Sequence, residues 1–509
     1  MVPDPALCYQ AVLARDRRYD GRFFTCVKST GIYCRPICPA RPPLLKHCEF
    51  VTSAAAAQQA GFRPCLRCRP ESSPGMGAWC GTSTSVQRAL SLIEMGALDE
   101  GDVTGLAERL GLGDRHLRRL FQQHLGTTPM AVAQTRRLLL AQQLIQQTQL
   151  PMADVAMASG FGSIRRFNET FLALFGRAPS ALRRKGGQAA PGAADTDITL
   201  RLAYRPPYDW PRLLAFLKTR AIPGVEHVDE QAYRRVIDLR DDASSAAPSP
   251  QPPHAPQGHG IGFLEVRHLP EYHSLAVKVR CSRLDRLPAI IARVRRMFDL
   301  DADPVAIEAA LSRDARLQPI VAAQTGLRLP GAWDPFETAV RAILGQQITV
   351  TGAIRLAGQF VDAMGYRLDT LGVPSPHPAL SHLFPRPTDV SDEGLQPLGM
   401  PGARKAALKA LAQQAAAEVQ LLQPAASLEE AVARLSSLPG IGEWTAQYIA
   451  MRGLHESDAF LAGDIGVQRA LATDGVRPTP KALLAHAEAW RPWRAYAVLH
   501  LWTSETPHD

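Results

Sequence analysis

The 509-residue sequence lacks several features that define whole classes of protein. No apolar run reaches the ~18 residues that a membrane-spanning helix needs, and residues 1–10 lack the basic-then-apolar order of a signal peptide. We therefore expect a cytoplasmic protein with no membrane partner. Aromatic residues make up only 6%, but 46% hydrophobic and 21% charged residues are typical of globular proteins. At roughly 150 residues per domain, the length predicts three to four domains.

Cysteine is almost absent after residue 80, because eight of the nine cysteines precede that point and only Cys281 follows it. In a reducing cytosol, clustered thiols more often hold a metal or do chemistry than form disulfides. Two pairs have the spacing of metal ligands, with three and two intervening residues: Cys34 and Cys38, then Cys65 and Cys68. Four thiolates at this spacing suit tetrahedral Zn²⁺, and a reduced, buried cysteine cluster is the alternative. The cysteines without such spacing are expected to be core or surface thiols: Cys8, Cys26, Cys48 and Cys80.

Acidic residues are scarce in the front part of the chain. Residues 1–190 hold 24 Lys and Arg against 13 Asp and Glu, although the net charge of the whole chain is only +9. The excess positive charge therefore lies in this segment. It favours a polyanion such as DNA as partner, while a solvated arginine-rich surface is the alternative.

Segments of different composition divide the chain. The small, unpatterned residues from Ala189 to Asp195 indicate a linker, which we place at 187–196. Residues 241–260 are mainly Ala, Ser, Pro, His, Gln and Gly, so a disordered surface loop is expected. Alternating residues around this loop predict a small antiparallel sheet, with strands at 198–202, 234–239, 263–269 and 275–279. From Leu284 onward the pattern is helical almost to the end.

Together with the motifs and family resemblances given below, these features predict a multidomain α+β protein with four domains. The expected order is a small zinc-bound α/β domain at 1–79, an all-α domain at 80–186, the linker at 187–196, a small antiparallel sheet with helices at 197–309, and an all-α domain at 310–509.

A helix-turn-helix pattern occurs twice within residues 103–171. In the first copy, a turn at 111–113 precedes Asp114, the expected N-cap of the second helix. In the second copy, a turn at 160–162 precedes Ser163, 49 residues later. Apolar positions of the two second helices are expected in the core: Leu117, Leu120, Phe121, Ile164, Phe167 and Phe171. Polar residues on the opposite face could reach bases or phosphates: Arg115, Arg118, Arg119, Ser163, Arg165, Arg166 and Asn168. Protein-binding hairpins or merely charged faces are the alternatives.

The C-terminal part contains a glycine turn, Leu438-Pro-Gly-Ile-Gly442, directly before a predicted helix. Backbone N–H groups at such a turn can face a phosphate. Trp444 and Tyr448 follow on the helix, and Asp464 comes twenty residues after Trp444. Each aromatic is by itself more often a core residue, and the ordinary role of the aspartate is a helix cap or an ion-pair partner.

The front of the chain resembles a known repair domain. Residues 30–36 read Thr-Gly-Ile-Tyr-Cys-Arg-Pro, and residues 60–70 read Ala-Gly-Phe-Arg-Pro-Cys-Leu-Arg-Cys-Arg-Pro. This resembles the N-terminal domain of the Ada methylphosphotriester repair family. The resemblance implies that Cys34 is both a zinc ligand and the nucleophile that takes a methyl group from a DNA phosphate, once and irreversibly. Methylation would lower the negative charge of the cluster from about −2 to about −1 and so tighten DNA binding. Four arginines could hold the DNA backbone: Arg35, Arg63, Arg67 and Arg69.

The duplicated helix-turn-helix, over about 84–183, resembles the AraC-type transcription regulators. This resemblance implies that promoter DNA and RNA polymerase are partners.

The remainder, about 197–509, resembles the AlkA-type alkylpurine glycosylases of the helix-hairpin-helix class, through segments such as 204–210, 342–346 and 490–494. The resemblance implies that Asp464 is the catalytic carboxylate that stabilises the sugar cation. It places Trp444, Tyr448 and Trp502 in the pocket for the damaged base. Further implied DNA contacts are the wedge residue Gln347 and the hairpin residues Pro439, Gly440, Ile441 and Gly442. The carbonyls of Ser436, Leu438 and Ile441 are implied ligands of a monovalent cation.

The chain departs from these families at informative points. Gln347 is polar, whereas the best-known glycosylase of the family has an apolar wedge residue at this position. Gly463 replaces an acidic neighbour of Asp464. No lysine stands where bifunctional glycosylases carry a Schiff-base nucleophile, so a monofunctional enzyme is expected. A Pro-Cys-His-Arg segment is missing, so direct repair of alkylated guanine oxygen is not expected. Two other functions stay open: a transcription regulator with a catalytically inactive glycosylase-like module, and a zinc-bearing DNA-binding scaffold without methyl transfer.

Overall fold

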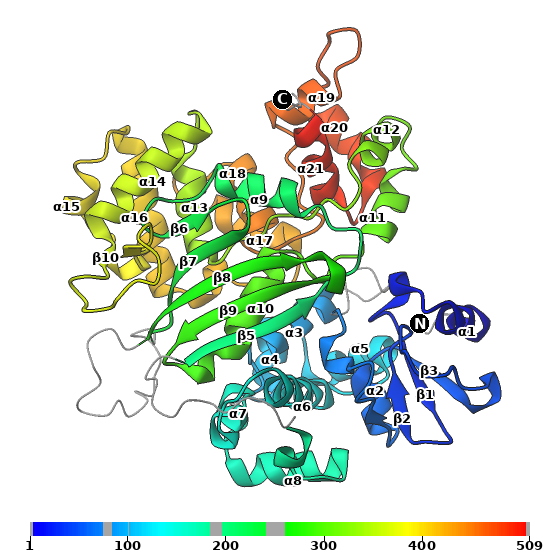
Figure 1. Ribbon diagram of the computed structural model, residues 1–509. Helices are drawn as coiled ribbons and strands as arrows, with labels where there is room; N and C mark the ends of the chain where they lie inside the picture. Colours follow the sequence, from blue (N-terminus) through cyan, green and yellow to red (C-terminus); the bar gives the residue numbers. More distant parts are fainter. Residues whose placement is uncertain (1–3, 75–83, 100, 184–195, 241–259, 505–509) are drawn as a thin grey trace.

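The computed structural model describes residues 4–74, 84–99, 101–183, 196–240 and 260–504. Figure 1 shows a small N-terminal sheet on one side, a layer of helices beneath a larger sheet, and a helical C-terminal half above it. The predicted linker and the predicted loop at 241–260 lie outside the described residues, except for Thr196 and Gly260. Across the described ranges, no helix is both long and apolar enough to cross a membrane.

The N-terminal module is a four-stranded sheet with two α-helices. Its strand order is β3-β1-β2-β4, and only the β2–β4 pair is parallel among these neighbours. The strands are β1 Phe24–Val27, β2 Ile32–Cys34, β3 Cys48–Val51 and β4 Arg63–Pro64; the helices are α1 Pro5–Ala14 and α2 Ala54–Gln59. Cys8 and Cys26 are fully buried, as expected for core thiols, and Cys48 is half-buried. Cys80 lies outside the described residues.

Six α-helices form the second module, and they contain both predicted helix-turn-helix units. The helices are α3 Thr84–Glu94, α4 Val103–Arg109, α5 Asp114–Leu125, α6 Pro129–Gln147, α7 Met152–Ala158 and α8 Ile164–Phe175. The two second helices, α5 and α8, end in the same way, because Gly126 (φ 66°) and Gly176 (φ 64°) adopt the left-handed conformation that closes a helix. The repeat in the sequence is therefore also a repeat in the structure.

Three expectations for this repeat differ from the structure. Asp114 is the first residue of α5 and not its cap, which is Gly113. Ile164 is 48% exposed and does not belong to the core, because it lies in the first turn of α8 beyond the reach of the neighbouring helices. Leu120 is half-buried. The expected cap Ser163 is confirmed, since its side chain accepts a hydrogen bond from the backbone N–H of Arg166.

The third module is a five-stranded antiparallel sheet of order β5-β9-β8-β7-β6. Its strands are β5 Thr196–Ala203, β6 Glu226–Val228, β7 Ala232–Asp238, β8 Ile261–Leu269 and β9 Ser274–Cys281, with the helices α9 Trp210–Lys218 and α10 Leu287–Met297. The four predicted strands are present, and β6 is additional. One hydrophobic core joins this sheet to the helix-turn-helix module, through residues such as Leu144 and Phe167 on one side and Leu200 and Val277 on the other.

The C-terminal half is helical, with one exception. Its helices are α11 Pro304–Leu311, α12 Leu317–Ala323, α13 Pro335–Leu344, α14 Val350–Met364, α15 Asp392–Leu395, α16 Gly402–Ala417, α17 Leu428–Ser436, α18 Glu443–Arg452, α19 Ile465–Ala470, α20 Pro480–Ala487 and α21 Arg494–Ser504. The exception is a short antiparallel pair, β10 Tyr366–Arg367 with β11 His382–Leu383. Prolines at 374, 376 and 378 prevent a helix between these strands. The predicted boundary at 309/310 falls inside α11.

Candidate repair sites and DNA interface

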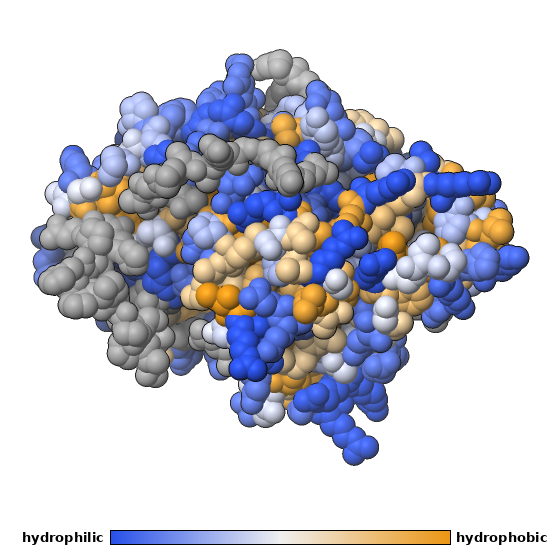
Figure 2. Space-filling view, turned by 60° about the horizontal axis from the view of Figure 1, so that its bottom comes forward, coloured by the Kyte–Doolittle hydropathy of each residue, from blue (hydrophilic) through white to orange (hydrophobic). Residues whose placement is uncertain are grey.

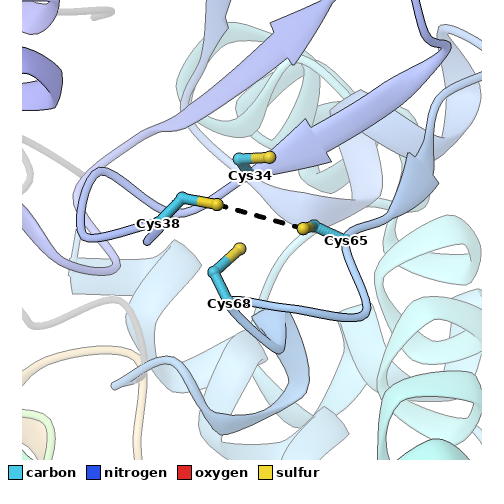
Figure 3. A group of neighbouring side chains, drawn as sticks. All are labelled: Cys34, Cys38, Cys65 and Cys68. Atoms are coloured by element: carbon cyan, nitrogen blue, oxygen red, sulfur yellow. Dashed lines mark hydrogen bonds between the residues drawn. The ribbon is translucent and has the colours of Figure 1, made fainter. Parts of the chain in front are cut away.

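The four predicted ligand cysteines come together in the N-terminal module. Cys34 is the last residue of β2, and Cys65 directly follows β4, which pairs with β2 in parallel. The four sulfur atoms all lie within 4.8 Å of one another, and their side chains point inward to one centre (Figure 3). The sulfur atoms of Cys38 and Cys65 are 4.0 Å apart. Four convergent thiols at these distances fit a tetrahedral Zn²⁺ site, for which Zn–S distances of about 2.3 Å are usual.

Arg35 is a structural residue of this cluster, which corrects the expectation that it contacts DNA. It is only 7% exposed, and its Nε donates to a carboxylate oxygen of Asp20 at 2.8 Å. The same guanidinium donates to the carbonyl of Cys68 at 3.0 Å, and the backbone N–H of Arg35 donates to the Cys68 sulfur at 3.3 Å. Asp20 and Cys68 occupy the guanidinium, so Arg35 supports the cluster, although part of the residue also lines the adjoining cleft.

A cleft of about 410 Å³ opens beside the cysteine cluster, and Cys34, Cys38 and Cys65 line it. The expected DNA-binding residues Arg63 and Arg67 are exposed on this cleft. Arg69 is not part of its lining as described, and its Nε is hydrogen-bonded to Glu71 at 2.9 Å. The cleft thus combines a candidate nucleophile with two arginines, Arg63 and Arg67, that have no ion pair within the described part of the chain.

Two more arginines line the same cleft and were not predicted. Arg41 belongs to the loop after Cys38, and Arg177 follows α8 of the second helix-turn-helix unit. Both are exposed, as are Arg63 and Arg67. Phe175 and Leu182 lie beside Arg177 in the cleft wall. Proximity to the cysteine pair could have indicated Arg41, but the sequence gives no signal for Arg177, because its position depends on how the two modules pack.

The candidate DNA-reading residues are exposed on α5 and α8. This holds for all seven: Arg115, Arg118, Arg119, Ser163, Arg165, Arg166 and Asn168. Some already have partners on their own helix, since Arg118 pairs with Asp114 at 2.7 Å and Arg165 with Glu169 at 2.8 Å. Figure 2 turns the lower side of the molecule toward the viewer, and hydrophilic side chains there are interrupted by apolar patches. Exposed Met157, Ile164 and Leu172 belong to α7 and α8.

Asp464 is the N-cap of α19, and it is also held by two indole rings. Its Oδ1 accepts from the backbone N–H of Val467 at 3.0 Å and from Nε1 of Trp502 at 2.9 Å. Its Oδ2 accepts from Nε1 of Trp444 at 3.0 Å. Gly466 permits this arrangement, because a Cβ there would lie 3.2 Å from the ring of Trp502. Asp464 therefore does cap a helix, as the alternative interpretation expected, and its carboxylate is also held in a fixed orientation.

A cleft of about 710 Å³ lies in front of this carboxylate, and Trp444, Tyr448 and Trp502 all line it. The rings of Trp444 and Tyr448 stack, with centroids 5.3 Å apart and planes 12° from parallel. Trp444 is 36% exposed, so its other face is open to a flat ligand. The predicted residues are thus assembled around Asp464.

Charged residues that also line this cleft were not predicted. Arg452 donates to the hydroxyl oxygen of Tyr448 at 2.9 Å. Burial raises the pKa of Tyr448, but the neighbouring Arg452 and Arg220 outweigh it and lower the pKa below the usual value. Both guanidinium groups also lie over the ring of Phe216, at 4.8 and 3.8 Å from its centroid. Helical spacing could have linked Arg452 with Tyr448, whereas nothing in the sequence connects Phe216 or Arg220 with them.

The predicted hairpin is the turn between α17 and α18. Gly440 has φ 77°, and a Cβ there would lie 2.6 Å from Cβ of Ala407, so glycine is required. Pro439 and Gly442 are also exposed, while the side chain of Ile441 is buried and leaves only its backbone for a DNA contact. The side chain of Gln346 donates to the carbonyl of Gly440 at 2.9 Å. This bond ties the hairpin to Gln347, which is exposed and has φ 57°.

Comparison with known proteins gives three family matches along the chain. The Metal binding domain of Ada matches residues 7–71, a Helix-turn-helix domain matches residues 106–185, and the AlkA N-terminal domain matches residues 199–334. The Ada match and the four convergent thiols together identify Zn²⁺ as the metal of the cluster.

Curated relatives resemble either the whole chain or its parts. A "Probable bifunctional transcriptional activator/DNA repair enzyme AlkA" of Mycobacterium tuberculosis is 40% identical over 504 residues, which cover 98% of this chain and 96% of that protein. "DNA-3-methyladenine glycosylase 2" of Escherichia coli is 33% identical over 308 residues, covering 60% of this chain and 96% of that protein. "Bifunctional transcriptional activator/DNA repair enzyme Ada" of Escherichia coli is 40% identical over 131 residues, covering 25% and 35%. Because similarity extends over nearly the whole length, the chain belongs to the family of bifunctional transcriptional activator/DNA repair enzymes that join Ada and AlkA domains.

Proposed function

We propose that this DNA-binding repair enzyme acts on alkylated DNA at two separate sites and that repair at the first switches on transcription. Cys34 accepts a methyl group from a phosphotriester, and Asp464 supports the excision of alkylated purines of the 3-methyladenine type. The observation that carries the proposal is the carboxylate of Asp464, which both Trp444 and Trp502 orient toward a cleft of about 710 Å³.

In the first site, Cys34 Sγ attacks the methyl carbon of a methylated DNA phosphate. An S–C bond forms and the C–O bond breaks, so the electron pair stays on the phosphate oxygen and leaves an ordinary phosphodiester anion. When bound, Zn²⁺ keeps the thiols deprotonated at neutral pH. The exposed arginines Arg41, Arg63, Arg67 and Arg177 hold the neighbouring phosphates in the cleft. The thioether product is stable, so each chain reacts once.

Methylation also changes the charge that DNA meets. One thiolate becomes a neutral thioether, so the formal charge of the occupied cluster rises from about −2 to about −1. Because phosphate contacts dominate affinity for DNA, weaker repulsion tightens promoter binding by the arginines of α5 and α8. We further propose that RNA polymerase is recruited to the promoter by the helix-turn-helix module.

In the second site, the damaged base turns out of the duplex and stacks on the open face of Trp444. Gln347 fills the vacated space, and the hairpin from Leu438 to Gly442 holds the backbone. The bond between sugar and base breaks with its electron pair on the positively charged base, which leaves as a neutral molecule, and water then bonds to the sugar and releases a proton to the solvent. The carboxylate of Asp464 stabilises the positive charge that develops on the sugar. The carbonyls of Ser436, Leu438 and Ile441 would hold a monovalent cation at the hairpin.

The glycosylase is monofunctional in this proposal. No lysine occurs between Leu438 and Trp444, so no amine is available there to form a Schiff base with the sugar. The product is an abasic site in an uncut strand. Its test is a single-turnover reaction on a duplex with one 3-methyladenine, in which strand breaks should appear only after alkali. Breaks at neutral pH would contradict monofunctional action, and absence of any released base would favour a regulator with an inactive glycosylase-like module.

We also propose that the chain acts as four domains, at 1–79, 80–186, 197–309 and 310–509, with the segment 187–196 as the linker. Helix α11, at Pro304–Leu311, crosses the last of these boundaries.

A further inference from the structure

A buried arginine of the glycosylase half contacts the methyl-acceptor module. Arg205 follows β5, and its side chain is 1% exposed. Its Nε donates to the backbone carbonyl of Asp20 at 2.9 Å, across a sequence separation of 185 residues. On its own side, Nη1 of Arg205 donates to the carbonyl of Asp301 at 2.8 Å, and the carbonyl of Arg205 accepts from Arg328. Arg205 is therefore fixed in the glycosylase half and reaches into the neighbouring module.

The residue that Arg205 holds is the one that supports the cysteine cluster. The carboxylate of Asp20 accepts from Nε of Arg35 at 2.8 Å, and both side chains are more than nine-tenths buried. Arg35 in turn donates to the carbonyl and to the sulfur of Cys68. A continuous path of hydrogen bonds thus runs from Arg205 through Asp20 and Arg35 to a metal ligand.

The adjoining residues reinforce this contact. Arg22 Nε donates to a carboxylate oxygen of Asp303 at 2.8 Å, and the side chain of Asp303 is 2% exposed. Gly21, between Asp20 and Arg22, has φ 75°. A Cβ at Gly21 would lie 2.3 Å from the carbonyl oxygen of Pro74 and 2.8 Å from Nη2 of Arg205, so the absence of a side chain lets both groups approach the backbone.

We propose that Arg205 is a positioning residue for the cysteine cluster, so that the glycosylase half forms part of the scaffold of the methyl-acceptor site. The physical reason is that a group which holds a metal ligand in place, as Arg35 holds Cys68, typically changes metal affinity by 10–100-fold when it is altered. Arg205 in turn helps to fix Asp20, the partner of Arg35. Without Arg205, the carbonyl of Asp20 is buried without this donor, and residues 20–22 shift to find another. Arg35 then loses its fixed partner and Cys68 its fixed orientation. The chemical consequence rests on the proposed methyl transfer to Cys34, but the effect on the metal site does not.

The test compares full-length Arg205→Gln with the matched variant Arg88→Gln. Arg88 is another buried arginine between modules, since it pairs with Glu456 at 2.8 Å and its side chain is 6% exposed, but it does not contact the N-terminal module in the interactions described. The readouts are the rate of Zn²⁺ loss to a chelator and the absorption spectrum of the Co²⁺-substituted chain. We expect Arg205→Gln to lose Zn²⁺ about 10-fold faster, the lower end of the range for groups that hold a metal ligand directly, and to shift the cobalt–thiolate bands, with Arg88→Gln like the parent. Arg205→Lys keeps a donor and should restore part of the effect.

Equal Zn²⁺ loss from Arg205→Gln and the parent would overturn the proposal, and so would equal acceleration in Arg88→Gln, which would indicate general loosening. If Arg205→Gln does not fold, Asp20→Asn provides the test from within the N-terminal module. That variant keeps the carbonyl for Arg205 but weakens the bond to Arg35, so it should also lose Zn²⁺ faster, and an unchanged rate would contradict the path. Methyl uptake is scored separately. Its absence in the parent would refute the proposed transfer while the metal readouts still decide the role of Arg205.

Discussion

At the scale of single residues, Asp464 combines two roles that one substitution can separate. The change Asp464→Asn keeps an oxygen for the N–H groups of Val467 and Trp502 and so preserves the cap of α19, although its amide nitrogen cannot accept from Nε1 of Trp444. It removes the charge that faces the developing sugar cation. We expect the single-turnover rate of 3-methyladenine release to fall on the order of 10²–10³-fold, or about 2.7–4 kcal/mol. Affinity for alkylated duplex, measured by fluorescence anisotropy, should change far less, because the stacked rings remain.

The control is Asp102→Asn, which changes the carboxylate that caps α4 in another module. It should alter neither rate nor binding. An Asp464→Asn enzyme that releases 3-methyladenine at the parent's rate would show that the carboxylate only caps a helix.

The sequence could predict those parts of the sites that consist of particular residue types at fixed spacing. The pairs Cys34–Cys38 and Cys65–Cys68 and the cap Ser163 depend on neighbours a few positions away, and the structure brings them together as expected. Arg35 shows the limit of such reasoning. Because it follows a ligand cysteine, we expected Arg35 to be an exposed cation that binds DNA. In the structure it is buried and pairs with Asp20, which belongs to another segment.

At the scale of elements, α5 and α8 are expected to act as the DNA-reading helices. Arg115 and Arg166 are exposed at the starts of these helices, and neither has an ion pair among the described residues. We expect the methylated chain to bind promoter DNA more weakly when it carries Arg115→Ala or Arg166→Ala. If the lost contact is to a phosphate, the salt dependence of log K should become shallower by about one unit.

Arg109→Ala is the control for this pair, because Arg109 of α4 already donates to Gln423 of the glycosylase half at 2.7 Å. Titrations at several salt concentrations check the prediction. Unchanged affinity and salt slope in both α5 and α8 variants would assign these helices to a role other than binding DNA.

Helix α21 should make stability depend on pH. Burial, with a smaller contribution from positively charged Arg212, lowers the pKa of His500 from 6.5 to about 4. The unfolded chain therefore takes up this proton near pH 6.5, whereas the folded chain resists it until about pH 4. The stability that His500 contributes is present above pH 6.5 and is lost as the pH falls toward 4, by about 2 kcal/mol at pH 5.

The variant His500→Leu has no imidazole at this position and so takes up no proton there in either the folded or the unfolded state. Its melting temperature should fall less than the parent's between pH 7.5 and pH 5, as followed by intrinsic fluorescence. The comparison between variant and parent removes the contribution of other titrating groups. An identical fall in both proteins would show that His500 is already able to protonate in the folded state.

Element type followed the sequence closely where the pattern is long and regular, as in β7, β8 and the helices of the C-terminal half. It failed at short or interrupted segments. The two-residue strands β10 and β11 have no periodicity to detect, and α11 crosses a boundary that composition alone had placed at 309/310. The packing of a short helix against its neighbours decides such cases.

At the scale of the whole molecule, the modules pack against one another through extensive contacts. One hydrophobic core includes residues from α6, α8 and the five-stranded sheet, and the buried pair of Arg88 with Glu456 joins residues 368 positions apart. The sequence predicted the modules from local motifs but could not predict this packing, because contacts at such separations leave no local pattern. The two candidate reaction clefts nevertheless share no lining residue, so their chemistry should be separable.

The most direct test scores both repair reactions in one incubation of the full-length chain with methylated duplex DNA. Freed methylpurines and methyl groups bound to protein are counted separately for the parent, Cys34→Ala and Asp464→Asn. We expect the parent to give both products, Cys34→Ala to give freed bases but no protein-bound methyl from phosphotriesters, and Asp464→Asn to give protein-bound methyl with little freed base. Methyl uptake by Cys34→Ala, or parental base release by Asp464→Asn, would contradict the account of two separate sites.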